Sequence, residues 1–159
     1  MPLIHRRALG FLLAITLASS SVHLTAATCK TTEGTFTSSL VPPPACTSPI
    51  GLCTIGALEG KQPETYNFVF DTLVPVDASQ SVYTGHSVVT RTHGGATLIG
   101  QDTGVMNFTG PTTATFVTTV NIVGGTKQFT NATGQYVATG ELDFVTGEAT
   151  GTFTSIVCK

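Results

Sequence analysis

Apolar and polar residues alternate along most of the chain with a period of two residues. In residues 31–40, Phe36 and Leu40 fall on one face together with Ser38, as expected for a half-buried β-strand. In residues 64–72, aromatic side chains occupy one face and mainly polar side chains the other. The same alternation predicts further strands at residues 81–92, 96–102, 113–123, 135–145 and 149–159, the next-to-last with Tyr136, Ala138, Leu142 and Phe144 on its apolar face.

Glycine and proline separate these strands. Three consecutive prolines at residues 42–44 exclude a hydrogen-bonded ladder, so we predict an ordered loop over residues 41–53. Gly94 and Gly95 stand between two strand-like runs, and the pair predicts a hairpin with a two-residue turn. The Asp-Thr-Gly triplet at residues 102–104 is that of aspartic proteases, but such enzymes need two facing copies. We interpret this triplet as a turn.

About eight antiparallel strands with one apolar face must cover that face, either by stacking as a sandwich or by closing as a barrel. Alternation places Cys29 and Cys158 on the polar face of the first and last strands. The start of the first strand meets the end of the last only if the sheet closes on itself. We therefore predict an all-β fold, a single antiparallel β-barrel of about eight strands.

Four cysteines allow two disulfides in three possible pairings, as is usual in an oxidising compartment. We predict Cys29 with Cys158, which staples the barrel, and Cys46 with Cys53, which closes a small loop. A zinc site is the alternative. It is disfavoured because the cysteines lack paired Cys-x-x-Cys spacing and the histidines lie far from them in sequence. No cofactor or metal is expected.

Residues 1–27 have the features of a secretory signal peptide. A basic start with Arg6 and Arg7 precedes an apolar run at residues 8–18 and a small-residue exit. A membrane anchor is the alternative, but the run is about half of the roughly 20 residues that a spanning helix needs. We expect a secreted protein, periplasmic or extracellular, with one barrel domain at residues 28–159.

The charge balance disfavours polyanionic partners. Removing residues 1–27 leaves five basic and nine acidic residues, a net charge of −4. No basic stripe is visible in the sequence, so neither nucleic acid nor an anionic membrane surface is an expected partner. The sequence leaves the oligomeric state open.

Residues 122–125 read Ile-Val-Gly-Gly, the start of the mature chain of chymotrypsin-like proteases. No Gly-Asp-Ser-Gly or Gly-x-Ser-x-Gly element follows, so we reject a protease. Instead, Gly124 and Gly125 end a strand and turn the chain sharply. We expect Phe129 to fold back and plug the barrel, with the small residues Ala132 and Gly134 where the returning backbone passes close.

The stretch from Ile122 to Cys158 resembles the pattern I-x-G-G-T-G-x-F-x-x-A-x-G of the dirigent and allene oxide cyclase-like β-barrel families. The likeness covers roughly residues 29–158 and is closest to small secreted bacterial proteins of unknown function, whose sequences are similar to "CTSPIGLCTIG" here. Lys127 departs from the pattern, which usually has glycine there. The resemblance implies the barrel and an apolar ligand inside it, and it transfers no catalytic residue.

Candidate ligand contacts come from the alternation. Tyr66 and Tyr136 lie on apolar faces, where each offers a hydroxyl either to a ligand or to the backbone. Arg91 and Asp102 share a face if Gly94 and Gly95 form the turn, with a solvated surface pair as the alternative. His86 falls on the opposite face from Arg91, which argues against a joint acid–base site. No residue is expected to be catalytic.

Three functions remain open from the sequence. The leading hypothesis is a non-enzymatic secreted barrel that binds a small apolar or phenolic molecule, and a completely filled interior would contradict it. The second is an isomerase or cyclase of the allene oxide cyclase type, which needs a polar group deep in the cavity. The third is a structural, envelope-associated protein without a pocket, suggested by low charge, abundant threonine and two disulfides.

Overall fold

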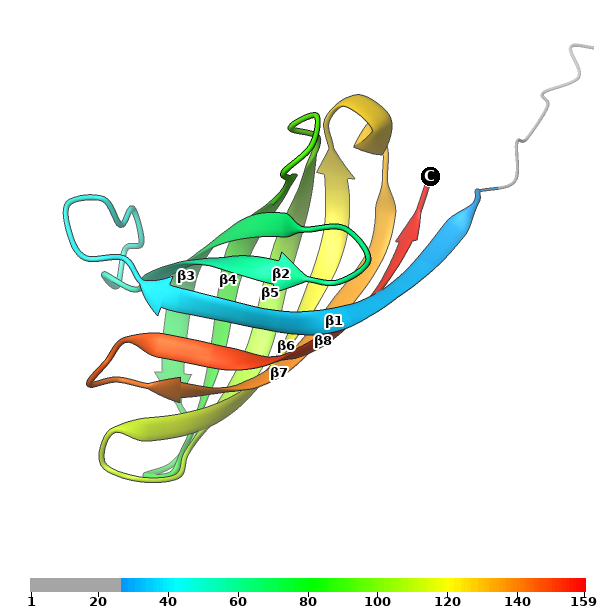
Figure 1. Ribbon diagram of the computed structural model, residues 1–159. Coiled ribbons are helices and arrows are strands. Elements are labelled where there is room, and N and C mark those ends of the chain that lie inside the picture. The colour runs from blue at the N-terminus through cyan, green and yellow to red at the C-terminus, as the bar shows by residue number, and fades with distance from the viewer. Residues whose placement is uncertain (1–26) are drawn as a thin grey trace, which may run out of the picture.

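The computed structural model describes residues 27–159, whose eight strands close into one antiparallel barrel (Figure 1). Each strand pairs with the next along the chain, and the last returns to the first. The predicted all-β barrel is therefore confirmed. The strands are β1 (Cys29–Leu40), β2 (Cys53–Glu59), β3 (Glu64–Pro75), β4 (Gln80–Arg91), β5 (Thr97–Phe108), β6 (Thr113–Gly125), β7 (Thr133–Asp143) and β8 (Glu148–Cys158), with the 3₁₀-helix η1 (Lys127–Phe129) between β6 and β7.

Two disulfides hold the barrel, one near each end. The Cα partners of β1 and β8 run from Cys29 opposite Cys158 to Ser39 opposite Glu148, and the first of these pairs is disulfide-bonded. The second disulfide, Cys46–Cys53, closes the β1–β2 loop at the opposite end. Both predicted pairings are confirmed, and they fit an oxidising compartment. Figure 1 shows the C-terminal end beside the start of β1.

Several boundaries differ from those predicted. A strand absent from the prediction, β2, begins at Cys53, directly after the proline-rich loop. Strand β5 continues through Asp102-Thr103-Gly104 to Phe108, so the interpretation of this triplet as a turn was wrong. Its glycine lies opposite Tyr83 in the ladder, where it makes room for an aromatic ring instead of bending the chain.

The β4–β5 hairpin has a longer loop than the predicted two-residue turn. The last ladder pair is Thr90 with Thr97, and the Arg91 amide donates to the Ala96 carbonyl at 2.9 Å. Gly94 and Gly95 both have positive φ, at 86° and 58°, so two glycines do turn the chain there. The loop takes in the two residues before them, which shifts the register. Ser87 consequently lies opposite Gly100 instead of Asp102.

Aromatic side chains fill much of the interior because glycines on the neighbouring strands leave room for their rings. A Cβ atom added at Gly104 would lie 2.2 Å from Cζ of Tyr83. One added at Gly85 would lie 2.5 Å from Cε2 of Phe68. Neither distance is compatible with a side chain, so these glycines are a packing requirement of the barrel.

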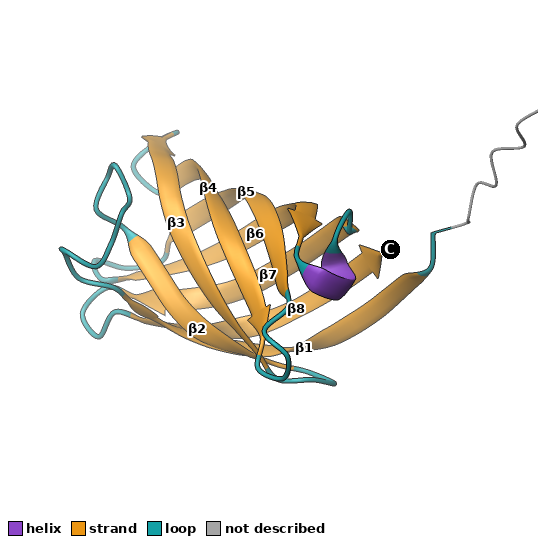
Figure 2. Cartoon of the chain, turned by 90° about the horizontal axis from the view of Figure 1, so that it is seen from above, coloured by secondary structure: helices purple, strands orange, loops and turns teal. Residues whose placement is uncertain are grey.

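The chain leaves β6 as predicted at Gly124 and Gly125. Figure 2 shows η1 at this end of the barrel. Phe129, in η1, is buried, as is Ala132. A Cβ atom on Gly125 would lie 2.8 Å from that of Phe129, so the close approach requires glycine. Lys127 has a φ of 53°, in the left-handed region that favours glycine, so its departure from the family pattern carries a backbone cost.

Phe144 lies outside the barrel, contrary to the prediction. Strand β7 ends at Asp143, and Phe144 in the following turn keeps 37% of its surface exposed while its ring packs near Phe108, with 6.1 Å between centroids. Alternation fails here because the strand has already ended.

The predicted signal peptide lies outside the described residues, apart from its last position. Within residues 27–159, no helix has the length and apolar character needed to cross a membrane.

Candidate functional site

A cavity of about 110 Å³ lies inside the barrel. Its wall is mainly apolar, and aromatic side chains form the largest group of lining residues. The aromatic lining residues are Phe36, Tyr66, Phe68, Phe70, Tyr83, Phe116, Tyr136 and Phe153. The interior is therefore well packed without being completely filled.

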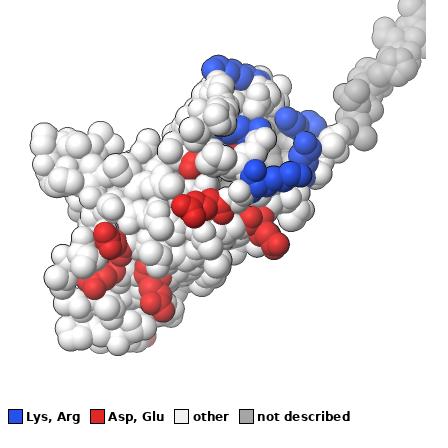
Figure 3. Space-filling model, in the orientation of Figure 1, with Lys and Arg blue, Asp and Glu red and all other residues white. Residues whose placement is uncertain are grey.

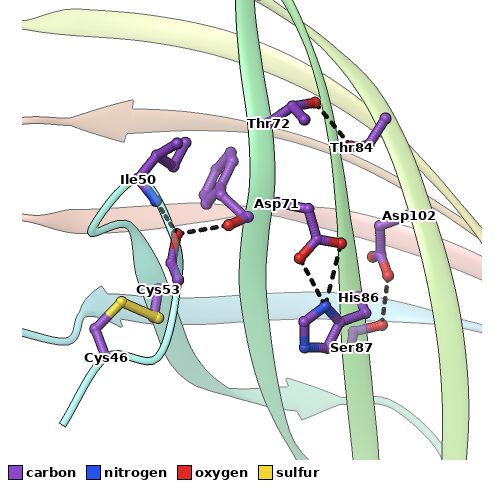
Figure 4. Close-up of polar contacts among 11 residues, drawn as sticks. Cys46, Ile50, Cys53, Asp71, Thr72, Thr84, His86, Ser87 and Asp102 are labelled. Carbon is purple, nitrogen blue, oxygen red and sulfur yellow. Dashed lines mark hydrogen bonds and ion pairs between the residues drawn. A yellow bond between two sulfur atoms is a disulfide. The ribbon is translucent and has the colours of Figure 1, made fainter.

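One wall of this cavity is polar and carries a carboxyl group. Asp102 points inward from β5, is only 3% exposed, and accepts a hydrogen bond of 2.9 Å from the Ser87 hydroxyl of β4 (Figure 4). Gly100, which faces Ser87 in the ladder, leaves space for that hydroxyl. Burial raises the pKa of Asp102 to about 6, and the hydrogen bond from Ser87 opposes part of the rise.

A second buried polar pair lies close to this carboxyl group. The hydroxyl of Tyr83 is hydrogen-bonded to that of Thr118, from β6, and both residues line the cavity. Burial raises the pKa of Tyr83 to about 12, and the charge of Asp102 adds to the rise. The Tyr83 hydroxyl is therefore neutral throughout the physiological pH range. It can form a hydrogen bond to a ligand in place of Thr118, but it does not offer a charge.

Three of the four predicted contacts line the inner cavity, namely Tyr66, Asp102 and Tyr136. Burial raises the pKa of both Tyr66 and Tyr136, and the nearby charge of Glu64 raises that of Tyr136 further. Arg91 also faces inward, but it lies at the end of β4, where its Nε is 3.3 Å from Oε1 of Glu64. Since Asp102 is buried far from solvent, the alternative of a solvated Arg91–Asp102 pair was wrong.

His86 lies on the outer face, as predicted. Its Nδ1 is 3.0 Å from Oδ1 of Asp71, and both side chains are about half exposed (Figure 4). The barrel wall separates this pair from Asp102, so the two groups do not form a joint acid–base site.

Sequence reasoning missed Tyr83, Ser87 and Thr118 as members of the polar wall. Alternation from Arg91 places Tyr83 and Ser87 on the inner face, so a sequence pattern for them was present. In β6 the apolar residues Ala114, Phe116 and Val120 alternate on one face, and the same period of two places Thr118 on that face, so a pattern for it was present as well.

A larger pocket of about 390 Å³ opens at the end of the barrel where β1 begins and β8 ends. Four basic residues line it, and we call it the basic mouth: Lys30, Lys61, Arg91 and Lys159. The sequence shows no basic stripe because these four residues are separated by about 30 positions or more along the chain. The fold brings them together in space.

Comparisons with known proteins give no relative for this chain. No protein-family model matches the sequence, and no curated protein and no solved structure matches it. The resemblance to the dirigent and allene oxide cyclase-like families stays a prediction from the sequence pattern.

Proposed function

We propose that the barrel is a secreted binding protein that holds one small apolar or phenolic molecule in its inner cavity. The observation that carries the proposal is the unfilled, mainly apolar cavity, rich in aromatic rings, with a buried carboxyl group in one wall. The resemblance to ligand-binding barrels of the dirigent type points in the same direction. A purely structural protein would gain stability by filling this space.

The size of the cavity limits the ligand to about one ring. Its volume of about 110 Å³ is of the same order as the ~150 Å³ apolar cavity that binds benzene in another protein. Flat aromatic walls suit a flat ligand, since offset and edge-to-face contacts between rings add to the burial of apolar area. Larger phenolic compounds would need the surrounding side chains to move.

The polar wall gives a reason for a phenolic group. Above about pH 6 the Asp102 carboxylate accepts a hydrogen bond, and a phenol supplies the donor that an apolar ring lacks. A charge-assisted hydrogen bond contributes about 1.5–3 kcal/mol. We therefore expect phenol to bind at least about 10-fold more tightly than toluene at pH 7.

Calorimetric titration with phenol and toluene tests this function. We expect a Kd of about 1 mM or lower for phenol. Ala138 lines the cavity, so the larger side chain of the Ala138→Leu variant should fill the space and abolish binding. The matched control is Val137→Leu, which adds bulk to the outer face one position earlier and should leave binding unchanged. Equal binding by both variants would place the ligand outside the cavity.

Asp102→Leu separates the polar contribution from the apolar one. This variant should lose the preference for phenol over toluene while still binding toluene. If the preference persists in Asp102→Leu, the carboxyl group does not recognise the ligand, and Tyr83 or Thr118 would have to do so.

The second candidate function is an isomerase that moves a proton within a one-ring substrate. The observation that favours it is the position of Asp102 on the cavity wall with a pKa of about 6, a value suited to a general base near neutral pH. In such a reaction the carboxylate removes a proton beside a carbonyl group and returns it to another carbon of the same molecule.

The conversion of cyclohex-3-enone to cyclohex-2-enone is a suitable probe, because its conjugated product is followed by ultraviolet absorbance. We expect a rate that rises with pH through about 6 and vanishes in Asp102→Asn. Phenol should inhibit the reaction by competing for the cavity. A wild-type rate no greater than that of Asp102→Asn would remove the enzyme function and leave the binding function intact.

A further inference from the structure

All five basic residues of the described chain gather at one end of the barrel. In an antiparallel barrel, the starts of odd-numbered strands and the ends of even-numbered strands share one end. The five residues occupy such positions: Lys30, Lys61, Arg91, Lys127 and Lys159. Figure 3 shows basic side chains gathered near the start of the described chain, with several acidic side chains next to them and the others farther down the barrel.

The basic mouth holds more positive than negative charge. Four basic side chains line it, and Glu64 is the one carboxylate side chain of its lining. Glu64 is already engaged, because it pairs with Arg91 and its Oε2 lies 3.5 Å from the Tyr136 hydroxyl. Within residues 27–159, no other lysine or arginine forms an ion pair with a carboxylate. The side chains of the lining therefore carry a net charge of about +3.

Two of the four basic side chains are held in place by an aromatic ring that lines the basic mouth. The guanidinium carbon of Arg91 lies 4.7 Å from the centroid of the Phe129 ring, and the Lys159 ammonium lies 5.4 Å from it. Because Phe129 is buried, its ring gives both cations a rigid support. The two cations repel each other, and an anion bound beside them would offset this repulsion.

We propose that the basic mouth binds a phosphate monoester group. A phosphate monoester carries about −1.5 to −2 charges near pH 7 and three acceptor oxygens, which matches several lysine donors better than a single carboxylate does. The pocket is concave and about 390 Å³ in volume, which suits a small molecule or a single headgroup. A polyanion would need an extended basic stripe instead.

This site does not depend on the binding proposed for the inner cavity. Tyr136 and Phe153 line both spaces, and their ring centroids lie 6.0 Å apart, so this pair forms the partition between them. A phosphate in the basic mouth requires no ligand inside the barrel. A one-ring substituent on the phosphate would lie against the same partition.

The test is a calorimetric titration at low ionic strength with inorganic phosphate and with phenyl phosphate. A second arm measures cosedimentation with vesicles of phosphatidylcholine containing phosphatidic acid, whose headgroup is also a phosphate monoester. Lys61→Gln and Lys159→Gln each remove one charge from the lining. Lys127→Gln removes the same charge at the same end but outside the lining, since Lys127 donates to the Gly94 carbonyl.

We expect Lys61→Gln and Lys159→Gln each to raise the Kd about 5-fold, and Lys127→Gln to change it by less than about 2-fold. Loss confined to the two lining variants, in the soluble arm or in the vesicle arm, supports the proposal and identifies the source of the phosphate. Absence of binding in both arms overturns it. So does an equal loss in Lys127→Gln, which would reflect general electrostatic attraction. Ala138→Leu, which fills the inner cavity, should leave phosphate binding unchanged.

Discussion

At the scale of single residues, Asp102 is the most informative side chain. A carboxyl group in an aromatic interior costs free energy when it is ionised, and one hydrogen bond from Ser87 offsets only part of that cost. Replacing it with an apolar residue would relieve the cost. A buried carboxyl group with a raised pKa in a cavity wall is typical of functional sites, and this supports the proposed role of Asp102 in ligand binding.

The raised pKa of Asp102 predicts how stability changes with pH. The folded protein holds this proton up to about pH 6 and the unfolded chain only to 3.8, so folding is favoured at low pH. As the pH rises from about 3 to about 7, through both pKa values, the wild type should lose about 3 kcal/mol of unfolding free energy relative to Asp102→Asn. Urea denaturation of both proteins across this range measures the difference.

Asp77→Asn is the matched control for that experiment. Hydrogen bonds from Ser79 lower the pKa of the exposed Asp77 carboxyl, so its small contribution is present above its unfolded pKa and lost as the pH falls. The two aspartates should thus show opposite pH dependence. A flat difference between the wild type and Asp102→Asn would mean that Asp102 is solvated in the folded protein.

Alternation predicted which face each candidate residue occupies, but not how deep it lies. Tyr66, Arg91, Asp102 and Tyr136 all face inward, as expected from a period of two. Depth depends on position along the strand: Asp102 lies near the middle of β5 and is buried, whereas Arg91 ends β4 and reaches the mouth. The strand ends had to be known before burial could be assigned.

At the scale of elements, β4 and β5 form a wall in which glycine and tyrosine are paired. Tyr83 and Gly104 are direct ladder partners, and the ring occupies the space that a side chain on Gly104 would fill. This pairing also positions the Tyr83 hydroxyl toward Thr118.

Gly104→Ala should therefore lower the free energy of unfolding by about 1–3 kcal/mol through overpacking. In a Tyr83→Ala background the same substitution should cost much less, because the obstructing ring is gone. Thermal unfolding of the four proteins of this cycle gives the coupling between the two positions. Equal costs in both backgrounds would show that Gly104 is needed for its backbone and not for the ring.

The elements themselves were largely predictable, and their registers were not. Alternation found most strands, but β2 was missed because it follows a proline-rich loop and holds only seven residues. The β4–β5 register was wrong because Gly94 and Gly95 identify a turn without fixing how many neighbours join the loop. Ladder contacts between Thr90 and Thr97 decide that, and they are tertiary information.

At the scale of the whole molecule, the two disulfides constrain loops of very different length. Cys29–Cys158 joins residues separated by 129 positions, and Cys46–Cys53 joins residues separated by 7. The loop-entropy model gives about 5 kcal/mol for the long bridge and about 2–3 kcal/mol for the short one. The long bridge also fastens the β1–β8 pairing that closes the barrel.

Replacing both Cys29 and Cys158 with serine should accordingly lower the unfolding midpoint more than replacing both Cys46 and Cys53. The expected difference is about 2–3 kcal/mol in the free energy of unfolding. Thermal unfolding of the two double variants measures it, and removal of whole pairs avoids a free thiol. A larger loss for the Cys46–Cys53 pair would mean that the β1–β2 loop contributes more through its native contacts, such as the 2.5 Å hydrogen bond from Ser48 to the Phe70 carbonyl.

The closure of β8 onto β1 also decides how this protein should be handled. Because Lys159 directly follows Cys158 and lines the basic mouth, an affinity tag appended there would emerge across the opening and compete with any anion. Peptide tags rich in acidic residues would be the worst choice. The β7–β8 turn at residues 144–147 lies at the far end of the barrel, and an immobilisation site inserted there would leave the mouth facing the solution.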